Sequence, residues 1–163
     1  MNNSNSRKLL YIIRGIPGSG KSTLARQIIA MGRNATLTCA YCEADMFFIQ
    51  PDGTYKFDPT KIGAAHNKCF NDILNAMKAD TDVCVVANTF TTLKEMQPYI
   101  DLAKNYDYEL KVVRVVSKNY DNLELDKVKR FAGYSNEHSV PMKTLAKMAD
   151  RFADYDGETI VYN

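Results

Sequence analysis

The chain has 163 residues, an apolar fraction of 45%, a charged fraction of 25% and a formal charge of +2. These values are typical of one domain that buries its own core, which we expect over residues 9–163. The charge is too small to indicate nucleic-acid binding by itself, and no apolar run approaches the roughly 20 residues that cross a bilayer. Residues 1–8 begin with a polar stretch that lacks a signal-peptide core. We therefore expect a flexible tail there and a cytoplasmic protein.

In chain order, the apolar periodicity predicts strands that alternate with helices. A short apolar strand precedes residue 14, and the helix after it is expected to stop at Gly32 and Asn34. The later expected strands are 36–42, 83–87, 109–116 and 159–162, and the later expected helices are 58–78, 92–106, 121–131 and one after Pro141. This alternation predicts an α/β fold with a parallel sheet and helices on both faces.

Residues 15–22 match the phosphate-loop pattern G-x-x-x-x-G-K-[ST] at every specified position. Glycines let backbone N–H groups surround phosphates, Lys21 adds a positive charge, and the Ser22 hydroxyl ligates Mg²⁺. The loop lies between a strand and a helix N-terminus, whose dipole favours anions. We therefore predict binding of ATP with Mg²⁺. The expected nucleotide-binding residues are Gly15, Pro17, Gly18, Ser19, Gly20, Lys21, Ser22, Thr23 and Arg151.

Asp45 comes just after the second predicted strand. Ligands of open α/β sheets gather at the carboxyl ends of the strands, so Asp45 should share an edge with the phosphate loop. A carboxylate there can accept the proton of an attacking hydroxyl in phosphoryl transfer. The alternative is an aspartate that only caps its loop. Glu43 is a second, lower-ranked candidate for the same role.

The end of the third predicted strand departs from expectation. Many phosphate-loop proteins have an aspartate here that holds Mg²⁺ through water, whereas this chain has Ala87 followed by Asn88 and Thr89. Neutral amides and hydroxyls can orient a hydrated metal ion, but they bring no charge to it.

Residues 121–141 are a candidate helical lid, and Arg130 is its candidate catalytic cation, with Lys127 and Lys129 as further choices. A mobile cation that closes over the γ-phosphate would stabilise the charge that develops during transfer. The alternative is a solvated helix face whose charges pair at i,i+3 and i,i+4 spacing.

The four cysteines allow two interpretations. Cys39 and Cys42 have C-x-x-C spacing, and His66 and Cys69 are three apart on a predicted helix, so a zinc site is conceivable. Residues three apart on a strand face opposite sides, however, and we favour reduced, buried apolar cysteines.

The chain resembles the kinase domain of phage polynucleotide kinase and the related small AAA-like ATP-binding kinases. The motifs that carry this resemblance are RGIPGSGKSTLA (14–25), ADMFF (44–48), YKFDP (55–59) and AHNKC (65–69), and it extends over about residues 10–152. It implies a three-layer P-loop NTPase with strand order 2-3-1-4-5, a helical lid, and Asp45 as general base for a 5′-hydroxyl. Ala87 replaces the family's aspartate, Ser135 stands at its lid arginine, and residues 47–49 lack the arginine that follows the base.

Three functions follow from these observations. The first is an ATP-dependent kinase acting on a hydroxyl, with a nucleic-acid 5′-end as the leading acceptor and partner. The second is a nucleotide-binding module with a weakened site, which Ala87 and Ser135 favour. The third is a small-metabolite kinase of the same fold.

Overall fold

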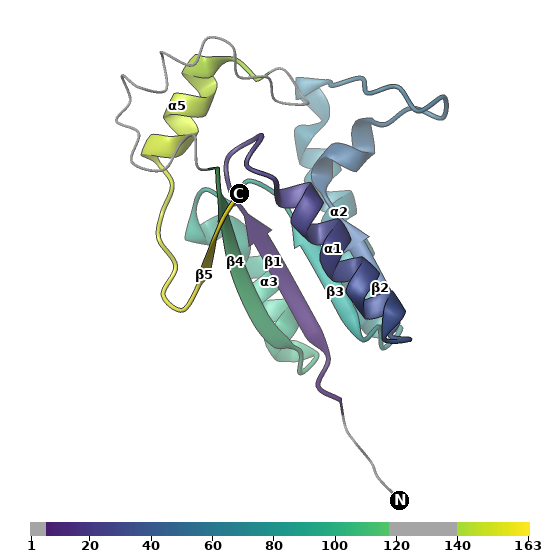
Figure 1. Cartoon of the computed structure of the whole chain (residues 1–163). Coiled ribbons are helices and arrows are strands. Elements are labelled where there is room, and N and C mark those ends of the chain that lie inside the picture. Colours follow the sequence, from purple (N-terminus) through teal and green to yellow (C-terminus); the bar gives the residue numbers. More distant parts are fainter. Residues whose placement is uncertain (1–5, 118–139) are drawn as a thin grey trace, which may run out of the picture.

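The computed structural model of the chain describes residues 6–117 and 140–163. Five parallel strands form one sheet in the order β2-β3-β1-β4-β5 (Figure 1). The strands are β1 (Leu9–Arg14), β2 (Cys39–Cys42), β3 (Val83–Ala87), β4 (Glu109–Val116) and β5 (Thr159–Tyr162). The predicted parallel sheet and its strand order are confirmed. All the carboxyl ends of the strands meet at one edge.

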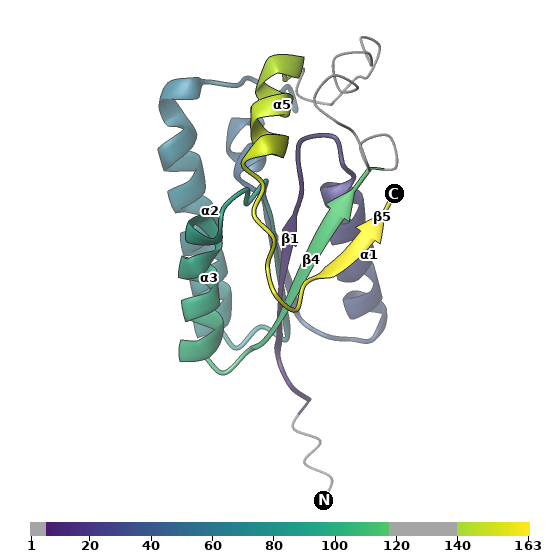
Figure 2. The same cartoon turned by 90° about the vertical axis from the view of Figure 1, so that its left-hand side faces the viewer.

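Helices cover both faces of the sheet (Figure 2). One face carries α1 (Lys21–Asn34), and the opposite face carries α2 (Ile62–Lys78) and α3 (Leu93–Asn105). Two short 3₁₀ helices, η1 (Ala44–Phe48) and η2 (Pro59–Lys61), connect β2 to α2. The last helix, α5 (Met142–Asp150), lies beyond the carboxyl ends of the strands. The phosphate loop therefore opens toward the same edge as η1.

The core consists of two apolar layers, one on each side of the sheet. Every residue of β3 is buried, as its continuous apolar run predicts for a strand covered on both faces. The layer under α2 and α3 and the layer under α1 both draw on β1 and β3, so the strands that precede the phosphate loop and Asn88 are held from both sides.

The junction between α1 and β2 differs from the sequence prediction. The helix passes Gly32 and ends at Asn34, the second of its two predicted stops, but the strand begins at Cys39 rather than at residue 36. Thr36 adopts a left-handed φ of 60°, and its N–H donates to Arg33 O while Leu37 N donates to Gly32 O. These bonds end a helix in the Schellman manner, so residues 35–37 satisfy helix carbonyls and are not available for strand pairing.

The predicted helix starts are largely right. Asp58 accepts a hydrogen bond from Thr60 N at 2.9 Å, with Pro59 next to it, although the first turn is η2 and α2 proper begins at Ile62. Ile62 is exposed and does not belong to the buried face of α2. Thr92 caps α3 in a capping box with Glu95.

Several predictions lie wholly or mostly outside the described residues. They include the helix at 121–131, nearly all of the lid at 121–141, Arg130 and Ser135. No helix in the described ranges is long and apolar enough to cross a membrane.

Candidate functional site

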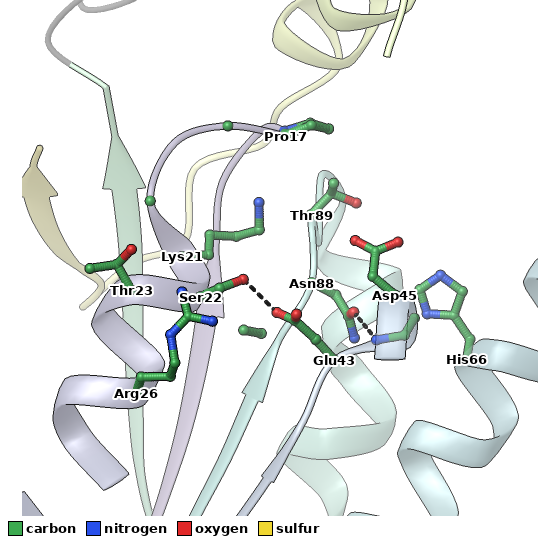
Figure 3. A pocket seen from close by; sticks show the side chains of 14 residues that line it. Pro17, Lys21, Ser22, Thr23, Arg26, Glu43, Asp45, His66, Asn88 and Thr89 are labelled. Atoms are coloured by element: carbon green, nitrogen blue, oxygen red, sulfur yellow. Dashed lines mark hydrogen bonds between the residues drawn. The ribbon is translucent and has the colours of Figure 1, made fainter. Parts of the chain in front are cut away.

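A pocket of about 320 Å³ lies at the carboxyl edge of the sheet, between the phosphate loop, the start of η1 and the loop after β3 (Figure 3). It brings together Asp45 and most of the predicted nucleotide-binding residues. Its lining residues are Pro17, Gly18, Gly20, Lys21, Ser22, Thr23, Arg26, Glu43, Ala44, Asp45, His66, Ala87, Asn88 and Thr89.

The phosphate loop leaves the N-terminus of α1 open to an anion. Gly20 is the N-cap with a φ of 100°, no side chain caps the helix, and its first turn holds no acidic residue. At the other end of the loop, a Cβ on Gly15 would lie 2.5 Å from Val115 O, so only glycine lets the loop pass this close to β4. The loop can therefore present N–H groups and the helix dipole to phosphates.

Lys21 and Arg26 bring positive charge to the pocket, and Lys21 belongs to the phosphate loop itself. Its Nζ donates a hydrogen bond to Ile16 O at 3.0 Å. Burial lowers the pKa of Lys21 to about 8, while the carboxylates of Asp45 and Glu43 act in the opposite direction. Lys21, which is half-buried in the pocket lining, thus lies near two carboxylates, and a triphosphate would offer its ammonium a more highly charged partner.

Asp45 projects into the pocket from η1, as the sequence predicts (Figure 3). The Tyr55 hydroxyl donates to Asp45 Oδ1 at 3.2 Å. Burial, followed by the charge of Asp45, raises the pKa of Tyr55 to about 12, so this phenol remains a donor at neutral pH. The exposed ring of His66, on α2, lies beside Asp45. Asp45 therefore faces both the phosphate loop and the mouth of the pocket.

The amide of Asn88 has a structural role. Its Oδ1 accepts a hydrogen bond from Ala44 N at 2.8 Å, and its Nδ2 lies 3.8 Å from Cys69 Sγ. The side chain is almost fully buried and fixes the start of η1 against β3. Asn88 therefore positions the segment that carries Asp45, and Ala87 before it contributes only an apolar wall.

Glu43, which the sequence analysis ranked below Asp45, makes direct contact with the phosphate loop. Its Oε2 accepts a hydrogen bond from Ser22 Oγ at 2.7 Å (Figure 3). The same oxygen accepts a hydrogen bond from Tyr41 OH at 2.7 Å. A hydroxyl, a carboxylate beside it and phosphate oxygens form the hard oxygen donor set that Mg²⁺ prefers, with water completing the shell. The residues present therefore fit a magnesium–nucleotide complex at Ser22.

A second hollow of about 430 Å³ adjoins the pocket and shares His66 and Thr89 with it. Its walls are mainly apolar and aromatic, and they come from α2, α3 and the loop after β3. The further lining residues are Asn67, Phe70, Phe90, Glu95, Pro98 and Tyr99. Asp45 lines the first pocket, and His66 and Thr89 connect that pocket with this hollow.

Three predicted nucleotide-binding residues lie outside the pocket lining. Gly15 shapes the base of the loop, and Ser19 is buried behind it, with no hydrogen-bond partner for its Oγ among the described residues. Arg151 donates from Nε to Thr91 Oγ1 at 3.1 Å. Arg151 thus ties the end of α5 to the loop after β3.

Sequence reasoning missed Arg26 and His66 as pocket residues. Arg26 follows Ser22 by one helical turn, a spacing that could have indicated a shared face. His66 lies in the AHNKC motif at residues 65–69, but the sequence analysis considered it only as a possible zinc ligand.

Cys42, Cys69 and Cys84 are buried, as the favoured interpretation predicts, whereas Cys39 is half-buried. Cys39 packs with the apolar layer under α1, whereas Cys42 belongs to the layer under α2 and α3, so the two thiols lie on opposite faces of the sheet. All four cysteines are free thiols. Within residues 6–117 and 140–163, no three His, Cys, Asp or Glu side chains are grouped to hold a metal ion. A magnesium ion held mainly by Ser22, phosphates and water needs no such group.

Comparison with known proteins identifies similar chains. The AAA domain family model matches residues 10–155. NEDD4-binding protein 2 of Homo sapiens is 28% identical over 153 residues, which cover 94% of this chain and 8% of that protein. The 2',3'-cyclic-nucleotide 3'-phosphodiesterase of Rattus norvegicus is 28% identical over 134 residues, which cover 76% of this chain and 30% of that protein. The chain thus spans less than a third of the length of either relative.

A solved structure supports the fold. A chain of the Pnkp1/Rnl/Hen1 RNA repair complex superimposes with a TM-score of 0.62 at 19% identity, covering 93% of this chain and 46% of that chain. At this identity the likeness concerns the fold alone. Because the family model spans most of the chain, the protein belongs to the AAA domain family, and its fold is that of a P-loop kinase-like domain.

Proposed function

We propose that this chain is an ATP-dependent kinase that transfers the γ-phosphoryl group of ATP to a hydroxyl, with a nucleic-acid 5′-hydroxyl as the acceptor. The observation that carries the proposal is the position of Asp45, which shares one pocket with Lys21 and Ser22. A kinase needs a carboxylate near the γ-phosphate to accept the proton of the acceptor, whereas a protein that only binds nucleotide does not.

On the donor side, the N–H groups of the phosphate loop and the ammonium of Lys21 would hold the β- and γ-phosphates. Ser22, with Glu43 beside it, would hold Mg²⁺, which neutralises phosphate charge. The low-dielectric surroundings that depress the pKa of Lys21 also strengthen its attraction to a triphosphate.

On the acceptor side, Asp45 would accept the proton of the attacking hydroxyl. The hydroxyl oxygen forms a bond to the γ-phosphorus as the bond from that phosphorus to the β–γ bridging oxygen breaks. The proton goes to Asp45, and ADP leaves with the bridging oxygen. Tyr55, which donates to Asp45, keeps the carboxylate oriented toward the acceptor.

The hollow next to Asp45 supports a nucleic-acid acceptor. The half-buried ring of Phe70 and the exposed ring of His66 line it, and planar bases pack well on aromatic surfaces, whereas Phe90 and Tyr99 in the same lining are almost fully buried core residues. A hydroxyl at the end of a strand whose first base entered this hollow would be close to Asp45.

Transfer of labelled phosphate from ATP would test the proposal. We expect label on an oligonucleotide with a 5′-hydroxyl and none on the same oligonucleotide with a 5′-phosphate. Nucleosides and sugars complete the panel. Label only on a nucleoside or sugar would make the chain a small-metabolite kinase and would remove the nucleic-acid acceptor from the proposal.

A nucleotide-binding module remains the second candidate, because β3 ends in Ala87 and Asn88 is committed to Ala44. This function predicts ATP binding in a calorimetric titration and no label on any acceptor of the panel. The two measurements together separate the candidates.

A further inference from the structure

This chain lacks the acidic residue that phosphate-loop enzymes usually have at the end of β3. In phosphate-loop enzymes a carboxylate at this place accompanies the loop Ser or Thr in holding Mg²⁺. Here Ala87 occupies the end of β3, and the amide of Asn88 is engaged with Ala44 N and Cys69 Sγ. Thr89, the next residue in the pocket, is neutral. The loop after β3 therefore offers a magnesium ion no negative charge.

The neighbouring strand brings a carboxylate to the same level. In the parallel register of β2 and β3, Cys42 lies opposite Val86, so Glu43 follows at the level of Ala87. Glu43 keeps an extended backbone, with φ −135° and ψ 146°, and so continues the direction of β2. Adjacent strands are about 4.8 Å apart, a gap that the longer glutamate side chain can span.

The side chain of Glu43 reaches the phosphate loop at the start of α1. Its Oε2 accepts a hydrogen bond from Ser22 Oγ at 2.7 Å, across 21 positions of the chain. With its proton engaged by the carboxylate, the Ser22 oxygen keeps its lone pairs for a cation. A carboxylate that accepts a hydrogen bond from a ligating hydroxyl orients that hydroxyl and makes its oxygen a better ligand. Outer-shell carboxylates act in this way at other metal sites.

Tyr41 fixes the position of Glu43. The Tyr41 hydroxyl donates to the same Oε2 at 2.7 Å. Burial first, and then this bond to Glu43, raise the pKa of Tyr41, so the phenol stays a donor at any physiological pH. Asp45, which lies on η1, accepts its hydrogen bond from a different tyrosine, Tyr55. The two carboxylates of the pocket are therefore oriented by different tyrosines. Both act on Lys21, and Glu43 is hydrogen-bonded to Ser22.

We infer that Glu43 is the outer-shell carboxylate of the magnesium ion of bound MgATP: it holds the Ser22 hydroxyl that ligates the ion, and it supplies the negative charge that Ala87 does not. The inference rests on the proposed function for its nucleotide. It divides the roles in the pocket: Glu43 serves the metal ion and the donor phosphates, and Asp45 serves the acceptor hydroxyl.

Calorimetric titration of ATP in EDTA and in Mg²⁺ tests this division. In the wild type, Mg²⁺ should raise the affinity for ATP. In Glu43→Gln, this gain should shrink by about tenfold or more, the usual effect of losing an outer-shell partner. The affinity in EDTA should stay equal or rise, since the variant removes a negative charge near the phosphates. The amide oxygen can still accept from Ser22, so the fold should be retained.

Two further variants complete the test. Asp45→Asn removes one negative charge from the same pocket and should keep the full gain from Mg²⁺. Tyr41→Phe leaves the charge of Glu43 in place but frees its side chain, and should lose part of the gain. Electron paramagnetic resonance of Mn²⁺ with ADP provides a direct metal readout, in which Glu43→Gln should bind Mn²⁺ more weakly.

The outcomes separate the inference from the proposed function. An undiminished gain from Mg²⁺ in Glu43→Gln, with wild-type binding of ATP, overturns the role of Glu43 and leaves the kinase proposal standing. An equal loss in Asp45→Asn also overturns it, because the effect would then follow pocket charge alone. A wild-type protein that binds no ATP under either condition overturns both.

Discussion

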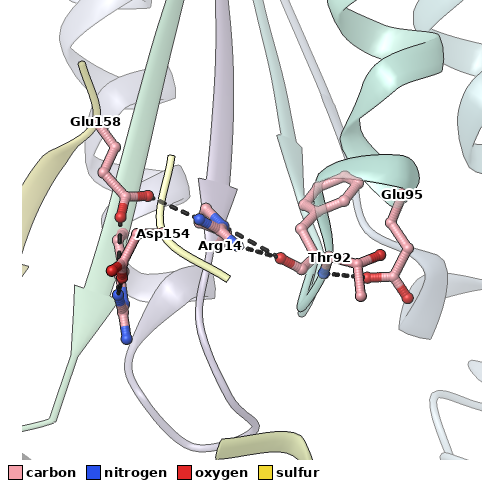
Figure 4. A network of polar contacts seen from close by, with 7 residues as sticks. Arg14, Thr92, Glu95, Asp154 and Glu158 are labelled. Carbon is pink, nitrogen blue, oxygen red and sulfur yellow. Dashed lines mark hydrogen bonds and ion pairs between the residues drawn. The ribbon is translucent and has the colours of Figure 1, made fainter. Parts of the chain in front are cut away.

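Arg14 and Glu158, which are 144 positions apart in the chain, form an ion pair of 2.8 Å with side chains only 0% and 6% exposed (Figure 4). Arg14 is the last residue of β1 and directly precedes the phosphate loop. Its guanidinium also donates twice to Phe90 O and lies 4.3 Å from the centre of the Phe152 ring. One buried cation therefore joins β1, the loop after β3 and the segment between α5 and β5.

Glu158→Gln should lower the free energy of unfolding by about 3–5 kcal/mol, because it leaves the buried charge of Arg14 without a counter-ion. Urea unfolding would measure the loss. Arg14→Met should cost less, since Glu158 keeps Arg114 at 3.7 Å. The matched control is the exposed pair Lys68–Asp72, for which Asp72→Asn should change the value by no more than about 1 kcal/mol. Equal effects at both pairs would contradict the structure.

Gly15→Ala should destabilise the protein by about 1–3 kcal/mol and weaken ATP binding, because the added Cβ would press on Val115 O and Ser19 Oγ. Neither atom can retreat easily, since one belongs to the backbone of β4 and the other is buried. Gly63→Ala serves as the control: α2 is regular there and nothing lies within 4 Å of the new Cβ. The control should be neutral or gain up to about 1 kcal/mol. Thermal melts with and without ATP would show both effects.

The affinity for ATP should depend on the charge of Lys21. With its pKa near 8, the ammonium is largely present at pH 7 and is lost as the pH rises through 8. In EDTA, we expect affinity to be full below about pH 8 and to fall by up to tenfold per pH unit above it, as one proton is taken up on binding. Lys21→Met should bind far more weakly at pH 7 and show no such dependence.

A loss of fold stability caused by deprotonation of Lys21 cannot explain this fall in ATP affinity above pH 8. The pKa of Lys21 in the fold lies below its ordinary value of 10.5. The unfolded chain therefore binds more protons between about pH 8 and 10.5, and the contribution of Lys21 to stability rises with pH across that window. Titrations at pH 7, 8 and 9 that gave one constant affinity in the wild type would contradict the assigned role of Lys21.

If Asp45 is the general base, Asp45→Asn should lower phosphate transfer by about 10²–10⁴-fold and leave ATP affinity nearly unchanged. The amide keeps the shape of the side chain but cannot accept the proton. Tyr55→Phe removes the 3.2 Å hydrogen bond to Asp45 but leaves the carboxylate in place, so it should have a much smaller effect. Single-turnover transfer and equilibrium binding, measured on the same samples, separate the two quantities. A parallel loss of binding and transfer would make Asp45 a structural residue.

The sequence alone determined the parts of this protein that depend on neighbours in the chain. Phosphate-loop geometry is encoded in eight consecutive residues, since glycines at set positions permit the conformations that the loop requires. Strands and helices were recognisable from apolar periodicity, and Asp45 could be placed at the correct edge because parallel strands share their carboxyl ends. Errors occurred where local signals compete, as at Thr36, whose β-branched side chain indicated a strand while the helix end required its backbone.

The tertiary structure decided which distant side chains meet. Contact between Ser22 and Glu43 depends on β2 lying next to β3 in one register and on α1 packing across the sheet from α2. A shift of that register by one residue would turn Glu43 to the other face. Burial likewise decided that Asn88 holds Ala44 instead of facing solvent in the pocket. These contacts depend on how all the strands and helices pack together in the core. A short stretch of sequence does not contain that information.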